Sequence, residues 1–237
     1  MTHRYILTLI MLLSGVFNTF NVYSQKSPIL SRPGNLEKSN LLPVPQQESY
    51  TGRNFSIGNN WALEPGSNIT SEDEAIKSLI AGLKEFANLE INLRTLNNTE
   101  TSPQHQIRLI IKSGSVVAGQ ATDTNRMAIS RQAYQLKLNP DEIIINANAP
   151  DGLFYGVQTL LQLIRQENRQ TLLPEGEIVD WPDLELRIIY WDCAHHLAKM
   201  ETFKHIIRQA AYFKINAIAL KLEGHFQFKN AEPIIEP

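Results

Sequence analysis

The sequence predicts a mixed α/β fold, and three patterns indicate it. Two segments, near 72–88 and from 151 to 164, carry apolar residues at the 3.6-residue period of amphipathic helices. Three short segments rich in β-branched residues have the character of strands: 106–113, 133–139 and 142–147. After Pro182, a strand, a helix and a second strand follow in turn, which is typical of a parallel βαβ unit. An α/β domain followed by the start of another domain is therefore expected.

Composition and charge narrow the class of protein. The chain has 237 residues, of which 43% are hydrophobic and 19% charged, as in ordinary globular proteins. A formal net charge of −2 creates no strong field, so neither nucleic acid nor an anionic membrane surface is expected as a partner. The single cysteine, Cys193, lies within an apolar strand segment. It excludes an intrachain disulfide and is expected to be a buried, inert thiol.

The first 24 residues have the pattern of a secretory signal peptide. Arg4 provides a positive start, residues 5–17 form an apolar run, and Ser24 precedes the expected cleavage site. The apolar run is too short to cross a bilayer core as a helix, so no membrane anchor is expected. These features predict a secreted or periplasmic protein. Residues 25–40 are rich in Ser, Pro, Asn and charge and are expected to be a linker.

The two helices of the α/β domain have recognisable starts. Ser71 and Glu74 form an S-x-x-E capping box ahead of the first helix. Its expected buried face consists of Ala75, Ile76, Leu79, Ile80, Leu83, Phe86 and Ala87. Asp151, which follows Pro150, is the expected N-cap of the second helix. The buried face of that helix is expected to consist of Leu153, Val157, Leu160, Leu161 and Ile164.

The βαβ unit comprises strands at 185–192 and 216–223 and a helix at 200–214. The expected buried face of its helix consists of Met200, Phe203, Ile207, Ala210 and Ala211. Near-continuous apolar strands predict a parallel pair joined by a right-handed crossover. Since the unit comes so close to Pro237, residues 181–237 are expected to be an incomplete domain.

The amino-acid sequences of three segments resemble those of one known protein family. DGLFYGVQTLLQLI at 151–164 resembles the helix that closes the N-terminal domain of β-N-acetylhexosaminidases of glycoside hydrolase family 20. The run from 180 to 216 resembles the first strand and helix of that family's catalytic barrel, and LPVPQQ at 42–47 resembles its opening strand. The resemblance implies a zincin-like α/β accessory domain at 41–180. Residues 181–237 would then be the first βαβ unit of a truncated (β/α)8 TIM barrel.

The resemblance also implies substrate-binding residues. Arg187 matches the arginine that bonds sugar hydroxyls in the −1 subsite, and a guanidinium is a rigid fork of donors suited to neighbouring hydroxyls. Asp192 and His196 match the aspartate and histidine at the end of the same strand. Glu223 ends the second strand, where barrel enzymes place functional groups. The alternatives are a salt-bridged structural role for Arg187, and packing or mutual hydrogen bonding for Asp192 and His196.

In that family an adjacent Asp-Glu pair on the fourth barrel strand performs the hydrolysis. The Asp orients the 2-acetamido group of the sugar, which acts as nucleophile, and the Glu protonates the leaving oxygen. We expect this pair in a C-terminal barrel segment beyond Pro237, so that the present chain alone is inactive. Asp141-Glu142 follows Pro140 at a turn and is expected to be solvating rather than catalytic. LKLEGHFQFK at 220–229 departs from the family's usual run and indicates a divergent branch.

No metal or other cofactor is expected. The sequence has no H-E-x-x-H motif, and His195 and His196 would point to opposite faces of a strand, while His225 stands apart. The favoured hypothesis is an exported glycoside hydrolase that, in full-length form, removes terminal N-acetylhexosamine from glycans by substrate-assisted retaining hydrolysis. The alternative is a non-catalytic glycan-binding or interaction protein built on the accessory domain. A metal peptidase is a more distant hypothesis.

Overall fold

The computed structural model describes residues 40–94, 105–192 and 199–221. All of them belong to one compact unit, residues 35–237. The expected signal peptide and all but the last residue of the expected linker lie outside the described residues. Among the described helices, none combines the length and the apolar character that crossing a membrane requires.

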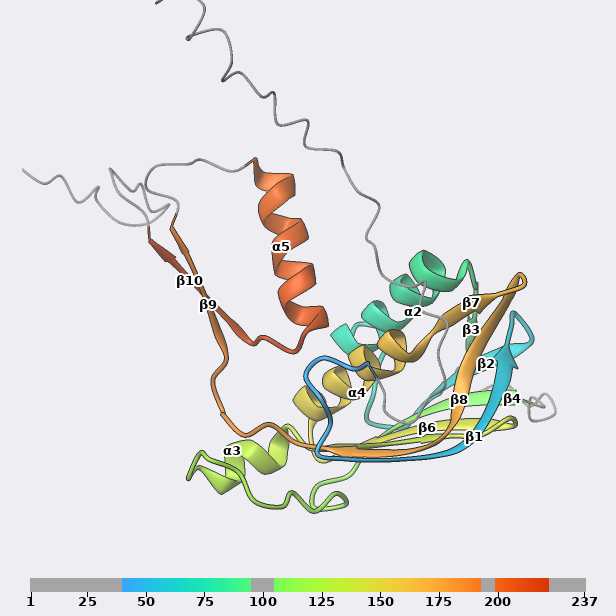
Figure 1. The fold of residues 1–237 in the computed structure, drawn as a ribbon, viewed down its shortest axis with the longest axis horizontal. Helices are drawn as coiled ribbons and strands as arrows, with labels where there is room; N and C mark the ends of the chain where they lie inside the picture. Colours follow the sequence, from blue (N-terminus) through green and yellow to red (C-terminus); the bar gives the residue numbers. More distant parts are fainter. Residues whose placement is uncertain (1–39, 95–104, 193–198, 222–237) are drawn as a thin grey trace, which may run out of the picture. The chain divides into compact units, whose positions relative to one another are not determined.

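A mixed sheet forms the base of the α/β domain (Figure 1). In spatial order its strands run β1-β8-β5-β6-β4-β2-β3, with β7 paired to β8. The pairs β2–β3, β2–β4 and β4–β6 are parallel, whereas β5, β8 and β1 join the sheet in antiparallel pairs. The strands are β1 (Gln47–Ile57), β2 (Trp61–Pro65), β3 (Asn92–Leu93), β4 (His105–Ile111), β5 (Tyr134–Leu138), β6 (Glu142–Ala147), β7 (Arg165–Glu167) and β8 (Gln170–Asp180).

Three of these strands, β4, β5 and β6, confirm the strand segments expected from the sequence. The opening segment 42–47 does not form the expected strand, because only Gln47 belongs to β1. Pro43 and Pro45 have no backbone N–H to donate to a ladder, which disfavours strand pairing there. The side chain of Gln162 holds this segment instead: it accepts from the N–H of Leu42 at 3.0 Å and donates to its carbonyl at 2.9 Å.

Helix α4 (Pro150–Leu163) packs against the middle of the sheet and against helix α2 (Glu74–Ala87). The expected apolar face of α4 is confirmed, since each of its five residues is buried. Close contact with the sheet depends on Gly156, where an added Cβ would lie 2.5 Å from Cγ2 of Ile145. On α2 the expected face is confirmed in part, because Ile80 is 37% exposed.

Both predicted helix caps are wrong. The N-cap of α2 is Asp73, and the box of Ser71 and Glu74 does not form, because Glu74 is already the first helical residue. The Asp73 carboxylate instead accepts from the N–H and the hydroxyl of Thr70, at 2.6 and 2.9 Å. The N-cap of α4 is Ala149, because Pro150 fits the first helical position. Asp151 therefore lies in the first turn, where it binds Arg131 at 3.2 Å.

A smaller core lies beside the sheet, around helix α3 (Arg126–Arg131). It combines Val116, Ile129, Ala133 and Trp181, all buried. The indole N–H of Trp181 donates to the carbonyl of Gln120 at 2.9 Å. This core packs the residues that immediately follow β8, where the chain passes towards the βαβ unit.

The βαβ unit is present and parallel, as the sequence predicts. Strand β9 (Ile188–Asp192) pairs in register with β10 (Ala217–Lys221), and helix α5 (Met200–Tyr212) connects them. Trp191 contacts Phe203 edge to face, with 6.3 Å between ring centroids. The expected buried face of α5 is wrong for Met200 and Ile207, which are 65% and 41% exposed because the described residues do not cover that part of the helix.

Candidate functional site

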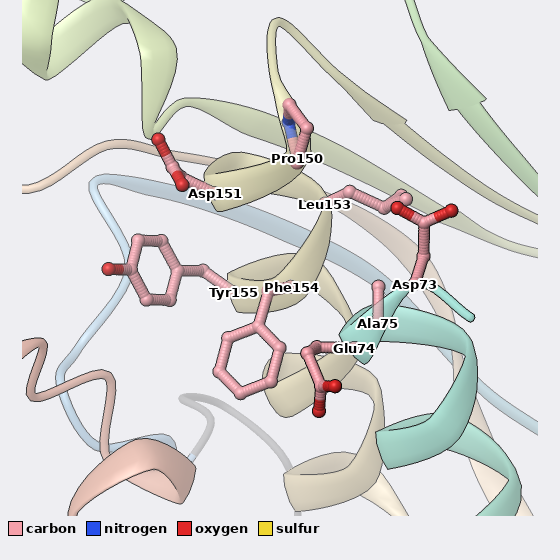
Figure 2. Close-up of a pocket in the computed structure, with 8 residues that line it drawn as sticks. All are labelled: Asp73, Glu74, Ala75, Pro150, Asp151, Leu153, Phe154 and Tyr155. Carbon is pink, nitrogen blue, oxygen red and sulfur yellow. The ribbon is translucent and has the colours of Figure 1, made fainter. Parts of the chain in front are cut away.

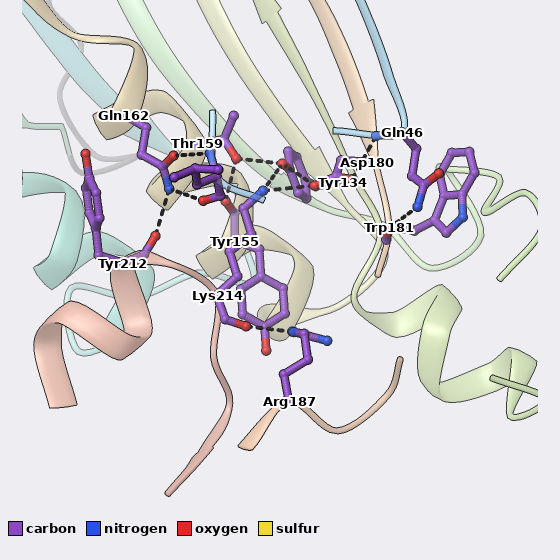
Figure 3. A network of polar contacts seen from close by, with 11 residues as sticks. Gln46, Tyr134, Tyr155, Thr159, Gln162, Asp180, Trp181, Arg187, Tyr212 and Lys214 are labelled. Carbon is purple, nitrogen blue, oxygen red and sulfur yellow. Dashed lines mark hydrogen bonds and ion pairs between the residues drawn. The ribbon is translucent and has the colours of Figure 1, made fainter. Parts of the chain in front are cut away.

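A cluster of buried polar side chains connects the chain just after α5 to the α/β domain (Figure 3). We call Tyr134, Thr159, Asp180 and Lys214 the lysine cluster. The Lys214 side chain, only 6% exposed, places its Nζ 2.9 Å from Oδ2 of Asp180 and donates to the Tyr134 hydroxyl at 2.8 Å. That hydroxyl donates to Asp180 at 2.8 Å and lies 2.6 Å from Oγ1 of Thr159. Each polar tip therefore has a partner inside the protein.

Burial shifts the titration of two members of the lysine cluster. Desolvation lowers the pKa of Lys214 from its ordinary value, although the adjacent Asp180 carboxylate opposes this by favouring the ammonium. Burial, and then the Asp180 carboxylate, raise the pKa of Tyr134 well above its ordinary value. Tyr134 consequently remains a neutral hydroxyl that can donate and accept. A buried ion pair with hydrogen-bonded partners fixes geometry, and the loss of one partner would strand a charge.

Arg187 lies directly before β9 and is held on several sides. Its Nε donates to the carbonyl of Lys214 at 2.8 Å, and its Nη1 donates to the carbonyl of Leu184 at 2.7 Å. The guanidinium lies over the Tyr155 ring, 5.1 Å from the centroid. The backbone N–H of Arg187 donates to the Asn216 side chain at 2.7 Å. A guanidinium has five N–H donors, and the two carbonyl bonds occupy two of them.

The structure does not gather the four expected site residues into one described cluster. Asp192 ends β9, is exposed, and forms an ion pair with Lys221 of β10 at 3.3 Å. Five residue steps of extended chain separate the Cα atoms of Arg187 and Asp192 by about 16 Å. His196 and Glu223 lie outside the described residues, as does Cys193. The roles of these side chains therefore stay predictions.

The sequence did not predict a pocket of about 310 Å³ between the starts of α2 and α4 (Figure 2). It is lined by Asp73, Glu74, Ala75, Pro150, Asp151, Leu153, Phe154 and Tyr155. Phe154 and Tyr155 fall outside the regular apolar stripe of α4, which is the one sequence feature that could have indicated it. The Arg187 guanidinium lies over the Tyr155 ring, so this one ring both lines the pocket and contacts the arginine.

The dipeptide Asp141-Glu142 lies where a bend leads into β6, whose first residue is Glu142, in agreement with the position expected from the sequence. The Asn139 side chain accepts from both backbone N–H groups, at 3.1 and 2.8 Å. The Glu142 carboxylate accepts from Gln106 and Arg108 on the neighbouring strand β4, at 3.0 and 3.1 Å. These contacts give Glu142 a cross-strand role. Within the described part of the chain, no group of three or more His, Cys, Asp or Glu side chains is arranged to hold a metal ion.

The fold and its contacts define a class: a mixed-sheet α/β domain with two packed helices, tied by a buried ion pair to a following parallel βαβ unit. Comparison with family models gives the particular family. The model described as glycosyl hydrolase family 20, domain 2, matches residues 38–181, more than half of the chain. The chain therefore belongs to glycosyl hydrolase family 20.

Curated relatives agree with this family. The chain is 27% identical over 209 residues to beta-hexosaminidase subunit A2 of Dictyostelium discoideum, covering 86% of this chain and 35% of that one. It is 26% identical over 200 residues to a beta-hexosaminidase of Porphyromonas gingivalis, covering 81% and 24%. A beta-hexosaminidase of Vibrio furnissii is 34% identical over 84 residues, 35% of this chain and 14% of that protein. The chain thus spans about a third or less of the length of these relatives.

Solved structures share the fold. A GH20 exo beta-N-acetylglucosaminidase of Vibrio harveyi, solved in complex with N-acetylglucosamine, superposes with a TM-score of 0.61 at 20% identity, covering 81% of this chain and 27% of that one. The GH20 beta-N-acetylhexosaminidase of Streptomyces coelicolor gives a TM-score of 0.57 at 21% identity, covering 76% and 34%. The mixed α/β fold is therefore similar to that of family 20 structures.

Proposed function

We propose that a protein carrying this chain is an exported β-N-acetylhexosaminidase that removes terminal N-acetylhexosamine from glycans. The observation that carries the proposal is a succession: the family match at 38–181 is followed at once by a parallel β9–α5–β10 unit with Arg187 at its start. This agrees with a zincin-like accessory domain at 41–180 and the first βαβ unit of a TIM barrel at 181–237. The signal peptide at 1–24 and the linker at 25–40 belong to the same proposal.

In this proposal the chain contributes substrate-binding groups to the barrel. Arg187 binds hydroxyls of the sugar in the −1 subsite with donors that its two carbonyl bonds leave over. Asp192 ends β9, and barrel enzymes place functional groups at strand ends. His196 and Glu223, which lie outside the described residues, are proposed as further substrate-binding residues from the family resemblance and their positions in the sequence. Hydrolysis is substrate-assisted: the 2-acetamido oxygen attacks the anomeric carbon, the leaving oxygen takes a proton from a Glu, and water then opens the intermediate with retention. The Asp-Glu pair for these steps belongs to a C-terminal barrel segment that this chain does not contain.

Hydrolysis of p-nitrophenyl N-acetyl-β-D-glucosaminide by the protein as its source produces it tests the proposal. We expect release of nitrophenol by the parent protein and a KM at least tenfold higher for Arg187→Lys, because lysine lacks the planar fork. Arg208→Lys, on the exposed side of α5, is the matched control and should leave KM unchanged. Intact mass of the same sample reports both the cleavage near Ser24 and the length of the mature chain.

Two other results would count against the proposal. A parent protein that binds N-acetylglucosamine but releases no nitrophenol would favour the alternative, a non-catalytic glycan-binding protein built on the accessory domain. That alternative would be strengthened if binding persisted in Arg187→Ala. Equal KM values for the parent and Arg187→Lys would remove Arg187 from the substrate-binding site.

A further inference from the structure

Lys214 takes part in two sets of contacts at once. Its ammonium enters the α/β domain and binds Asp180 and Tyr134, which belong to β8 and β5. Its backbone carbonyl, at the other end of the same residue, accepts from Nε of Arg187 at 2.8 Å. Figure 3 shows this arrangement, with the lysine cluster on one side of Lys214 and the Arg187 side chain on the other. The direction of that carbonyl therefore depends on how Lys214 is held.

The backbone around Lys214 transmits this constraint. Lys214, which follows the C-cap Phe213 of α5, adopts a left-handed conformation with φ of 60°, and its N–H donates to the carbonyl of Ala211. Two residues further on, the N–H groups of Asn216 and Ala217 both donate to the carbonyl of Arg187 at 3.1 Å. Arg187 is thus bonded through its backbone and its side chain to the segment 214–217. A rotation at Lys214 would move the acceptor of the guanidinium.

We propose that Lys214 is a positioning residue that sets the orientation of the Arg187 guanidinium through its buried ion pair with Asp180. The significance for catalysis rests on the proposed role of Arg187 as a sugar-binding residue. The structural part, that the ion pair immobilises the guanidinium, stands independently of that role. Lys214 itself touches no substrate in this proposal, since its ammonium is enclosed by the α/β domain.

Hydrogen exchange of the Arg187 side-chain Nε–H, followed by ¹⁵N NMR in the 237-residue chain, tests the structural part. The resonance is assigned by its disappearance in Arg187→Lys. We expect exchange at least tenfold faster in the double variant Lys214→Met/Asp180→Asn, which removes the ion pair without leaving an unpaired buried charge. Lys204→Met is the matched control, because Lys204 lies on α5, close to Lys214 in the chain, and binds Glu201 at the same 2.9 Å but is 54% exposed. Its Arg187 exchange rate should equal that of the parent.

A milder variant keeps the test decisive if the double variant does not fold. Tyr134→Phe removes the hydroxyl that contacts both Lys214 and Asp180 and leaves the ion pair and the ring in place. A smaller acceleration, about threefold, is expected for it. Parent-like Arg187 exchange in a folded variant of either kind would overturn the proposal.

The nitrophenyl glycoside assay then separates this inference from the function on which it rests. If both hold, Lys214→Met/Asp180→Asn raises KM as Arg187→Lys does, and Lys204→Met does not. If Arg187→Lys raises KM while the double variant leaves KM at the parent value, positioning by Lys214 is refuted and the proposed function stands. If Arg187→Lys leaves KM unchanged, the proposed sugar contact fails, and the exchange rates alone decide whether Lys214 orients Arg187.

Discussion

The side chain of Lys214 is only 6% exposed, although it carries a charge. Charged side chains are almost never fully buried unless they are paired, and Lys214 meets that condition through Asp180 and Tyr134. Replacing both members of such a pair can be nearly neutral, whereas removing one leaves an uncompensated charge in the interior.

Lys214→Met is therefore expected to lower the free energy of unfolding by about 3–5 kcal/mol, because Asp180 would remain buried without its cation. Lys204→Met removes an exposed ion pair of the same length and should change the free energy of unfolding by less than about 1 kcal/mol. Urea denaturation followed by circular dichroism gives both values. Equal losses for the two variants would show that burial of the Lys214 ion pair has no special effect.

Gly156→Ala is expected to destabilise the protein by about 1–3 kcal/mol, although alanine is the better helix former by about 1 kcal/mol. The new Cβ would meet Cγ2 of Ile145, which is attached directly to a stiff β-branched carbon in β6. Gly82→Ala on α2 is the matched comparison, because its neighbour is the movable end of Leu161. Thermal denaturation should give the larger loss for Gly156→Ala, and the opposite order would contradict the packing argument.

For single residues, the sequence predicted the buried apolar face of α4 well but predicted the contacts of polar side chains poorly. The five expected core residues of α4 follow from periodicity alone, since each needs only a neighbouring apolar surface. Lys214 could not be identified in this way, because its partners lie 34 and 80 positions away in the chain. The failed caps at Ser71 and Asp151 have a local reason: a different residue, Asp73 or Ala149, precedes the first helical turn.

Among the described strands, β9 and β10 are the two that lie outside the large mixed sheet. They form a two-stranded sheet in which Ile188 and Tyr190 are 51% and 64% exposed. Two strands alone are marginally stable in water, and parallel pairing is slightly weaker per residue than antiparallel pairing. The lysine cluster holds one end of this unit, because Lys214 lies between α5 and β10.

We expect the amides of β9 and β10 to exchange at least about tenfold faster than those of β4 and β6. Strands β4 and β6 are the internal control, because both lie inside the mixed sheet with neighbours on each side. Hydrogen exchange with mass spectrometry on the 237-residue chain measures all four strands together. Equal protection would show that the two-stranded sheet is as stable as the large one.

The elements themselves were largely predictable wherever the local pattern was strong. Strands β4, β5 and β6 and the parallel βαβ unit agree with the sequence, because continuous β-branched runs and amphipathic periods are local features. Strand β1 was not recognised beyond its first residue. Its sequence, QESYTGRNFSI, is polar because the strand lies at the sheet edge, with register irregular between Tyr50 and Asn54.

For the whole molecule, Tyr212, which lies at the end of α5 and contacts Phe86 of α2, contributes to the loss of stability at alkaline pH. Burial raises the pKa of Tyr212 to about 12, whereas an unfolded chain has the ordinary value of 10. Below pH 10 Tyr212 is protonated in both the folded and the unfolded state, so its full contribution to the free energy of unfolding is present. Between pH 10 and 12 the unfolded state loses its proton first, so stability falls as the pH rises.

Tyr212→Phe should therefore reduce the alkaline loss of stability, because phenylalanine keeps the ring contact with Phe86 and has no proton to lose. Urea denaturation at intervals from pH 8 to 12 measures the slope. Tyr190→Phe, on the exposed face of β9, is the control and should follow the parent curve. A parent-like slope for Tyr212→Phe would exclude Tyr212 as a source of the alkaline instability.

The position of β1 in the sheet has a consequence for how the chain is made. The backbone N–H of Gln46, directly before β1, donates to the side chain of Asp180, 134 residues later, and β1 pairs with β8 along its length. A ribosome adding about 5–20 residues per second needs on the order of ten seconds to synthesise the intervening chain. During that interval β1 has no partner strand, and Phe55 and Ile57, which are buried in the complete fold, stay exposed to solvent. Synthesis that stalled before β8 would therefore leave an open strand edge exposed to other chains.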